Sequence, residues 1–328
     1  MGLMVDGRWQ DVWYDTKASK GRFVRTEAQF RNWITPDGRP GPTGEGGFPA
    51  ERGRYHLYVS FACPWAHRVL IYRKLKGLEE LLPLSAVNLY MGAEGWTFEP
   101  GPSVIPDSVN GAKRLYEIYT IADSRYSGRV TIPLIWDKER RTIVSNESSD
   151  IIRMLNDAFD GITGNETDFY PSDLRKEIDE LNAKIYPNVN NGVYRAGFAT
   201  TQEAYEEAAN AVFAMLDEIE ARLATRRYLT GPRITEADWR LFTTLVRFDA
   251  VYFGHFKCNR RRIVDYPSLW GYVRDLHQTP GVAETVNVEY YKRHYYGSHK
   301  TINPHLIIPI GPEIDFAAPH DRARLSRG

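Results

Sequence analysis

Cysteine is scarce in this chain, since only Cys63 and Cys258 occur among its 328 residues. So few cysteines exclude a disulfide scaffold and indicate a reducing compartment, because small disulfide-stabilised domains are dense in cysteine. The N-terminus shows no basic segment leading into an apolar run, so no secretion signal is predicted. We therefore expect a cytoplasmic protein.

An excess of one charge and long apolar runs are also missing. Lys and Arg number 42 and Asp and Glu number 42, so the formal net charge is zero. A balanced chain has no electrostatic footprint for nucleic acid or for an anionic membrane surface. No apolar run approaches the roughly 20 residues of a membrane span. We accordingly expect no nucleic-acid partner and no association with membranes.

Apolar and aromatic residues, in contrast, are plentiful. Hydrophobic residues make up 42% of the chain, enough for one large domain or two ordinary ones with sizeable cores. Twenty tyrosines are present, and some lie in polar or glycine-containing contexts, as do Tyr194 and Tyr295. Such tyrosines favour an aromatic substrate pocket beside their usual role in core packing.

Cys63 follows an alternating run over residues 55–60 that predicts a strand, and it precedes Pro64, which suits the first position of a helix. Unpaired N–H groups and the helix dipole at such an N-terminus lower the pKa of a thiol from roughly 8.5. The position thus predicts a nucleophile, the alternative being a buried structural cysteine. Ala66 occupies the resolving place of a Cys-x-x-Cys motif and Cys258 is distant, so disulfide chemistry would need an external thiol.

Turn and periodicity signals divide the chain into three parts. Residues 1–53 are rich in Gly, Pro and Arg and predict an irregular N-terminal extension. Strands at 55–60, 82–89, 131–136 and 141–145 alternate with helices at 64–76, near 111–121 and from 147, which predicts an α/β layer over 54–160. Residues 170–328 predict an all-helical domain with helices at 173–186, 201–222 and 237–252, followed by an irregular tail after about 303.

Two local signals in these parts are informative. Pro133 at the entry of an apolar strand predicts a strand start, an edge position or a cis turn. Ser145 or Asn146 is expected to cap the helix from 147, which would leave Glu147 and Ser148 in a first turn able to bind a carboxylate, or simply form a cap. Thr235 and Asp238 predict a capping box, a folding signal without chemistry.

Taken together, these features resemble the glutathione S-transferases, and the finer motifs resemble their Xi class, the glutathionyl-hydroquinone reductases. The matching segments are Cys63-Pro64-Trp65-Ala66-His67-Arg68, Asn88 with Gly95-Trp96-Thr97-Phe98, residues 126–133, Ser145-Asn146-Glu147-Ser148, residues 190–199, Leu245-Val246-Arg247-Phe248-Asp249 and residues 298–304. The resemblance covers essentially the whole chain. It implies a thioredoxin-like glutathione-binding domain followed by an all-helical domain for substrate binding and homodimerisation.

The resemblance also implies an activity and residue roles. Glutathione is the expected co-substrate, no metal is expected, and Cys63 would take glutathione from an aromatic conjugate as a mixed disulfide. The residues expected to bind glutathione are Trp96, Arg129, Ile132, Glu147 and Ser148. The residues expected to line the hydroquinone pocket are Tyr194, Tyr252 and Tyr295, of which Tyr194 and Tyr295 are expected to act in catalysis.

Other functions stay open on the sequence. An omega-like thiol transferase or dehydroascorbate reductase would share Cys63 and the glutathione site, and so would a reductive dehalogenase. A non-catalytic interaction module is a further alternative, although it would have no chemical need for the thiol. His67 is an alternative acid or base, and otherwise we expect it at the surface or between domains.

Overall fold

The computed structural model describes residues 2–327, and the chain divides into two compact units. The N-terminal unit holds the chain up to Trp13 together with Arg25–Thr167, and the C-terminal unit holds Tyr14–Val24 together with the chain from Asp168 onward. The segment Tyr14–Val24, which lies inside the predicted extension, thus groups with the C-terminal unit. Each unit has a core of its own.

The N-terminal unit is a thioredoxin-like α/β layer. Its elements are β1 (Leu3–Val5), β2 (Arg8–Gln10), β3 (Tyr55–Val59), α1 (Pro64–Leu75), β4 (Leu84–Ala86), α2 (Leu115–Ala122), β5 (Gly128–Arg129), β6 (Leu134–Asp137), β7 (Thr142–Ser145), α3 (Ser148–Asp157) and α4 (Asp160–Thr163). A four-stranded sheet has the order β4-β3-β6-β7, in which only the β3/β4 pair is parallel. The α/β layer and its predicted strands are confirmed, with β4 shorter than the expected 82–89 and α2 beginning later than expected.

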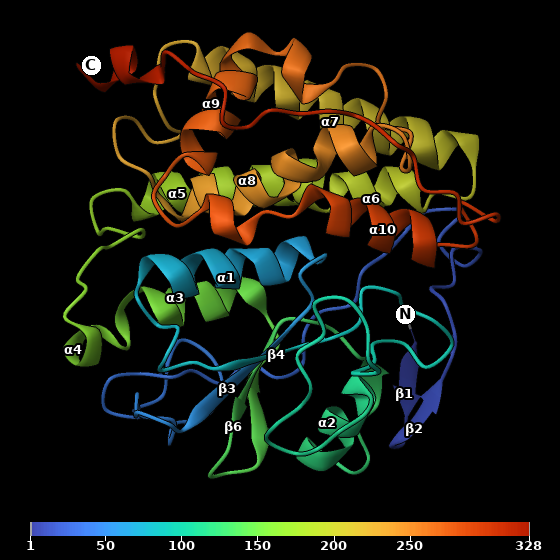
Figure 1. Ribbon diagram of the computed structural model, residues 1–328, viewed down its shortest axis with the longest axis vertical. Coiled ribbons are helices and arrows are strands. Elements are labelled where there is room, and N and C mark those ends of the chain that lie inside the picture. The colour runs from blue at the N-terminus through green and yellow to red at the C-terminus, as the bar shows by residue number, and fades with distance from the viewer. Residues whose placement is uncertain (1, 328) are drawn as a thin grey trace. The chain divides into compact units, whose positions relative to one another are not determined.

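The central strand β3 explains the position of the first helix. All five of its residues are buried, as the apolar run predicts for a strand covered on both faces. The chain then turns at Cys63 into α1, whose first residue is Pro64. The helices α1 and α3 pack against each other along the sheet, and α2 lies apart from them (Figure 1). The Ile132–Pro133 bond is cis, which confirms one of the three alternatives for Pro133.

The predicted irregular extension contains a short hairpin. Strands β1 and β2 pair around a turn at Asp6 and Gly7, where both residues have positive φ. Asp-Gly is a strong signal for this kind of turn, and the expectation of an irregular segment overlooked it. Strand β1 also pairs with β5, with Leu3 opposite Arg129. The hairpin therefore pairs with β5, the strand that carries Arg129.

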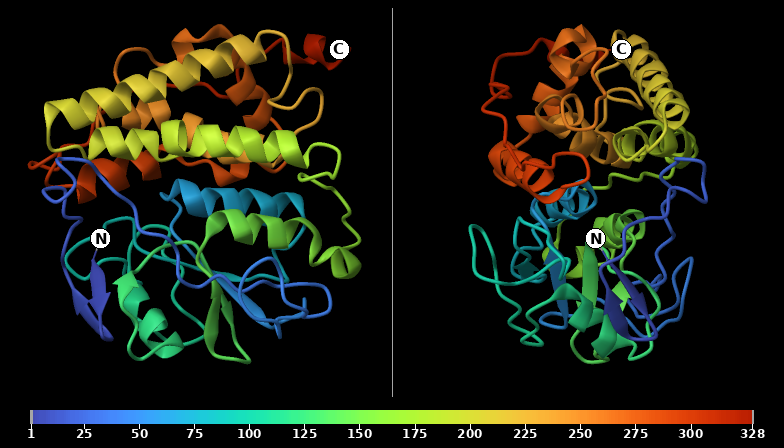
Figure 2. Two further views of the ribbon diagram at one scale, coloured as in Figure 1. Left: turned by 180° about the vertical axis from the view of Figure 1, so that it is seen from behind. Right: turned by 90° about the vertical axis from the view of Figure 1, so that its right-hand side faces the viewer.

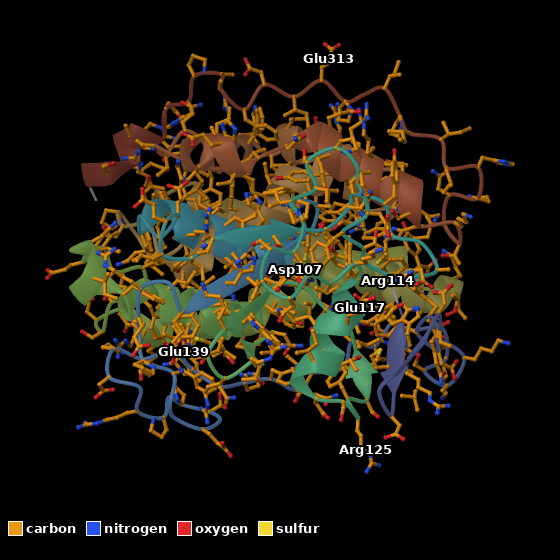
Figure 3. The ribbon with its side chains drawn as sticks, turned by 60° about the horizontal axis from the view of Figure 1, so that its bottom comes forward. Asp107, Arg114, Glu117, Arg125, Glu139 and Glu313 are labelled. Carbon is orange, nitrogen blue, oxygen red and sulfur yellow. The ribbon has the colours of Figure 1, made fainter. Side chains whose placement is uncertain are left out.

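The loop between β4 and α2 is fixed by several contacts. Ala86 pairs with Ile105, and Thr97 pairs with Arg114. The carboxylate of Asp107 accepts hydrogen bonds from three backbone N–H groups of residues 109–112 and from the hydroxyl of Tyr58, at 2.7 to 3.2 Å. Figure 3 labels Asp107 in this loop, together with Arg114 and Glu117 at the start of α2. The loop is thus held to β3 and β4 rather than detached from the sheet.

The C-terminal unit is all helical. Its elements are α5 (Arg175–Ile185), η1 (Tyr186–Asn190), α6 (Gly192–Gly197), α7 (Gln202–Leu223), α8 (Glu236–Arg247), η2 (Phe248–Tyr252), η3 (Ile263–Asp265), α9 (Pro267–His277), η4 (Ala283–Thr285), α10 (Val288–Ser298) and η5 (Arg322–Arg327). Here η1 and η2 are single π-helical turns, and η3 to η5 are 3₁₀ turns. In Figure 2, α5 and α6 follow one course beside the long helix α7.

Local signals in this unit are largely confirmed. The predicted stripe of α7 is buried, including Val212, Leu216 and Ile219, and Thr235 and Asp238 form the predicted capping box at α8. The single helix expected over 237–252 is wrong in its second part, because the chain changes to the π-helical turn η2 after Arg247. Within residues 2–327, none of the helices has the length and apolar character needed to cross a membrane.

Candidate functional site

Cys63 lies at the N-cap of α1, with extended backbone angles and a partly exposed side chain. Its thiol donates to the backbone oxygen of Ile132 at a sulfur–oxygen distance of 3.5 Å. Ile132 precedes the cis Pro133, and the turn that they form before β6 places the backbone of Ile132 against the start of α1. The structure thus brings together two residues that the sequence predicted for one site.

Glu147 and Ser148 form the start of α3. Glu147 is the N-cap residue, and its carboxylate accepts hydrogen bonds from the backbone N–H and the hydroxyl of Ser149 at 2.9 and 2.8 Å. Ser148 is buried, and its hydroxyl accepts a hydrogen bond from Arg68 at 3.4 Å. Glu147 thus completes the cap itself, one residue before the first turn.

The expectation that Ser145 or Asn146 caps α3 is therefore wrong, because both side chains are engaged elsewhere. The Ser145 hydroxyl accepts from the backbone N–H of Glu147 within the turn. The amide of Asn146 donates to the hydroxyl of Tyr119, and its oxygen accepts from the backbone of Phe30. Asn146, which the local pattern predicted as a cap, thus binds residues that are distant in the sequence instead.

Arg129 lies on β5, where its guanidinium donates to the backbone oxygens of Val12 and Trp13. A ligand carboxylate at Arg129 would therefore compete with these oxygens or use other N–H groups of the guanidinium, which has five. Trp96 is buried in the loop before α2, and its backbone oxygen accepts a hydrogen bond from Leu115. His67 is also buried, so of its two expected positions, at the surface or between domains, the structure excludes the surface.

Three tyrosines expected near the substrate meet inside the C-terminal unit. Tyr194 on α6, Tyr252 at the end of η2 and Tyr295 on α10 are all buried. The hydroxyl oxygens of Tyr194 and Tyr295 are 2.5 Å apart, and those of Tyr252 and Tyr295 are 3.2 Å apart. We call these three residues the tyrosine cluster. Residues as far apart as 101 positions in the chain thus form one hydrogen-bonded chain of phenols.

Burial keeps the phenols of Tyr252 and Tyr295 protonated. It raises the pKa of Tyr252 and of Tyr295 well above that of an ordinary tyrosine, and Tyr194 acts on the pKa of both in the same direction. The guanidinium of Arg247 acts in the opposite direction on both. At neutral pH the two phenols therefore carry protons that they can donate.

The π-helical turns bring two of the three phenols into place. Tyr252 is the last residue of η2, and η1 precedes α6, which carries Tyr194. The Asn190 amide, at the end of η1, donates to the backbone oxygen of Arg240 and to the hydroxyl of Thr244 on α8. Single π-helical turns frequently occur at functional sites. Sequence periodicity missed both, and Pro187 inside η1 is the one local signal for a change of helix type.

Other polar groups near the cluster were not predicted from the sequence. Arg247 is fully buried, and its guanidinium lies 3.7 Å from the ring centre of Tyr291. His255 and His299 are buried with ring nitrogens 3.0 Å apart. The signal for Arg247 that was available in the sequence was a single arginine inside the apolar run at 245–248.

Cys63 is the candidate nucleophile of the two cysteines. Cys258 is buried, and burial raises the pKa of its thiol to about 12, so it stays protonated and unreactive. Across residues 2–327, no group of three or more His, Cys, Asp or Glu side chains is arranged to hold a metal ion. The described residues thus include a candidate nucleophilic thiol in the N-terminal unit and a cluster of hydrogen-bonded phenols in the C-terminal unit.

Known proteins resemble this chain in both of its units. The family models "Glutathione S-transferase, N-terminal domain" and "Glutathione S-transferase, C-terminal domain" match residues 62–158 and 202–275. The glutathionyl-hydroquinone reductase YqjG of Escherichia coli is 57% identical, with 98% of each chain covered. PcpF of Sphingobium chlorophenolicum, which carries the same enzyme name, is 58% identical over 95% of this chain and 96% of its own.

Solved structures give the same result. The glutathione-bound structure of YqjG aligns with a TM-score of 0.90 at 54% identity, covering 98% of this chain and 99% of the other. A Xi-class glutathione transferase from Natrialba magadii aligns with a TM-score of 0.92 at 46% identity, covering 99% and 98%. This chain therefore belongs to the glutathione S-transferase family and, within it, to the Xi class of glutathionyl-hydroquinone reductases.

Proposed function

We propose that this protein reduces glutathionyl-hydroquinones to hydroquinones with glutathione, through a mixed disulfide on Cys63. The observation that carries the proposal is the tyrosine cluster, because buried, protonated phenols suit an aromatic substrate that must gain a proton. The near full-length identity to two enzymes named glutathionyl-hydroquinone reductase supports the same substrate class.

The first step is an exchange at sulfur. The Cys63 thiolate attacks the glutathione sulfur, a new sulfur–sulfur bond forms, and the bond from that sulfur to the aromatic carbon breaks. The electron pair of the broken bond goes to the ring carbon, which takes a proton from a phenol of the tyrosine cluster. The ring is reduced and leaves as a hydroquinone, and Cys63 is oxidised to the mixed disulfide.

The second step needs another thiol, since Ala66 stands where a resolving cysteine would be. A second glutathione attacks the glutathione sulfur of the mixed disulfide as a thiolate, which releases oxidised glutathione and the Cys63 thiolate. The proton given up by this glutathione balances the proton delivered to the ring. A monothiol site therefore consumes two glutathione sulfurs for each hydroquinone released.

Glutathione is proposed to bind in the N-terminal unit. Its carboxylates and ammonium need a guanidinium, a helix N-terminus and an acid, which Arg129, Ser148 and Glu147 supply. Ile132 offers backbone groups next to Cys63 for the cysteinyl residue, and Trp96 offers an apolar surface. No metal enters any of these steps.

An omega-like thiol transferase or dehydroascorbate reductase is the main competing function. It would use the same Cys63 and glutathione site, but its small substrates give no reason for three joined phenols. A reductive dehalogenase of aromatic substrates shares the mixed-disulfide step and differs in the leaving group. We also propose that the protein is cytoplasmic and forms a homodimer through the C-terminal unit. Sedimentation equilibrium of the purified protein tests the dimer.

The test uses Cys63→Ala beside Cys258→Ala as the matched control. The protein is incubated with a glutathionyl-hydroquinone and excess glutathione, and free hydroquinone and oxidised glutathione are followed. We expect Cys63→Ala to lose the activity and Cys258→Ala to retain it. Full activity in Cys63→Ala would exclude the mixed-disulfide mechanism.

A second variant tests the role of the phenols. Tyr295→Phe removes the central hydroxyl of the cluster and is expected to slow hydroquinone release. Exchange of the same protein with a simple glutathione disulfide needs no ring protonation, so it should stay largely intact. Equal loss on both substrates would refute the proposed role of the phenols.

A further inference from the structure

Arg247 is a charged side chain that the proposed mechanism does not use. It is the last residue of α8 and is 0% exposed. One of its N–H groups donates to the backbone oxygen of Thr243 at 2.8 Å, and the guanidinium lies on the ring of Tyr291. Because an arginine stays protonated even when buried, a permanent positive charge lies in the core of the C-terminal unit. Burying such a charge is costly, so its surroundings should indicate a use for it.

Four phenols interact electrostatically with this charge. They are Tyr291 and Tyr295 on α10, Tyr252 on η2 and Tyr194 on α6. Three of these four residues make up the tyrosine cluster. A cation among them favours the ionised form of each phenol over the protonated form, against the effect of burial. The charge therefore acts on the acidity of the phenols, which is the property that a proton donor needs.

We propose that Arg247 is a positioning residue of the tyrosine cluster, whose fixed charge stabilises the phenolate that forms when the cluster gives its proton to the departing hydroquinone. The inference rests on the proposed function and deepens it. In the step, one phenol O–H bond breaks, its proton joins the aromatic carbon and the electron pair stays on the phenol oxygen. The phenolate regains a proton from solvent after the hydroquinone has left.

The hydroxyl chain explains how the charge can act on any donor in the cluster. The hydroxyl of Tyr295 is within hydrogen-bond distance of both other hydroxyls. When one end of the chain loses its proton, Tyr295 can donate to the resulting oxygen anion, so that the negative charge is shared. The charge of Arg247 interacts with all three phenols, and its effect therefore does not depend on which phenol donates.

The first experiment reads the charge effect without using the enzyme reaction. The full-length protein is produced with a fluorinated tyrosine, whose phenol ionises nearer neutral pH, and the ionisation of each residue is followed by fluorine NMR. Cluster signals are assigned with Tyr252→Phe and Tyr295→Phe, and the exposed Tyr90 serves as an internal reference. We expect Arg247→Gln to move ionisation of the cluster to higher pH, Arg247→Lys to move it less, and Tyr90 to be unchanged.

The second experiment compares two substrates. Arg247→Gln is expected to lower kcat for hydroquinone release by about tenfold or more, a part of the ~10²–10⁴ that general acid catalysis supplies. Exchange with a simple glutathione disulfide should change by less than about twofold, because no phenol ionises there. Arg322→Met is the matched control, since Arg322 is a buried arginine that donates to backbone oxygens at residues 223, 226 and 227.

The outcomes separate this inference from the proposed function. If wild-type protein releases no hydroquinone, the proposed function fails, and the fluorine titration still measures the effect of the charge on the cluster. Unchanged ionisation of the cluster in Arg247→Gln, or equal loss on both substrates, overturns the role of Arg247. If Arg247→Gln does not fold, Arg247→Lys decides. If the cluster phenols of Arg247→Lys ionise near the wild-type pH, the retained positive charge supports the role. If their ionisation no longer responds to the protonated lysine, the role is overturned.

Discussion

Acidification is expected to destabilise this protein through two buried imidazoles, one in each unit. His56 on β3 is 2% exposed, and its Nε2 lies 2.8 Å from the hydroxyl of Ser85. The pKa of His56 is lowered to about 4, chiefly by burial, with Asp107 opposing the shift and Lys138 and Arg73 adding to it.

The second imidazole lies at the edge of the tyrosine cluster. His255 is 3% exposed and its Nε2 lies 3.0 Å from Nδ1 of His299. The pKa of His255 is lowered to about 3, chiefly by burial, and Lys257 and His294 act in the same direction. One of the two joined nitrogens must be unprotonated to accept the hydrogen bond. Proton uptake by both imidazoles would therefore break the contact that joins His255 to the end of α10.

The sign and size follow from the difference between folded and unfolded states. The pKa of each imidazole is lower in the folded protein than the unfolded value of 6.5, so below that pH the unfolded chain binds more protons. The stabilisation is complete above about pH 6.5 and is lost as the pH falls towards the folded pKa. At about pH 5 the expected loss is about 2 kcal/mol for His255 and about the same for His56.

The assay is urea unfolding of wild type, His255→Gln and His56→Gln at a series of pH values. Each variant should show about 2 kcal/mol less loss than wild type between about pH 7.5 and about pH 5, because its proton uptake is gone. His305→Gln, which removes an exposed imidazole, controls for the substitution itself. If His255→Gln loses as much free energy of unfolding over this range as wild type, the reasoning from burial is refuted.

Two further predictions concern the thiols and the extension. A thiol-alkylating reagent should label native protein at Cys63 and leave Cys258 unlabelled in the mass spectrum, because burial holds the pKa of Cys258 near 12; label on Cys258 without unfolding would contradict this. Arg31→Ala removes a two-bond contact to Asp150 in the first turn of α3, so we expect about 1–3 kcal/mol lower stability and weaker glutathione binding by calorimetry. Unchanged affinity would show that the contact does not support the proposed glutathione site.

The elements that the sequence predicted well are those set by neighbours in the chain. The apolar run of β3 and Pro64 at the start of α1 are local, and so is the capping box at Thr235. The cis bond at Pro133 was one of three alternatives, and the local pattern could not choose among them. These signals were enough for the fold and for the place of Cys63, because each acts within a few residues.

The predictions that failed depended on distant partners. Asn146 matches the local pattern of a cap, but Phe30 and Tyr119 take its side chain and leave the cap to Glu147. The apolar spacing of α8 continues past Arg247, so periodicity alone could not show the π-helical turn that follows. Resemblance grouped the tyrosines that are expected to line the substrate pocket, but the hydrogen bonds that join their hydroxyls depend on how α6, η2 and α10 pack.

The same reasoning applies to the N-terminal extension, in which residues 9, 12, 13 and 31 contact three places proposed to bind glutathione. Trp9 donates to the backbone oxygen of Ala93 in the loop that carries Trp96, and backbone oxygens of residues 12 and 13 accept from Arg129. Arg31 pairs with Asp150 at the start of α3. These contacts join residues 84 to 119 positions apart, so the extension is part of the proposed site rather than an appendage to it. Composition describes such a segment as irregular because its order comes from the partners that it binds, and not from its own periodicity.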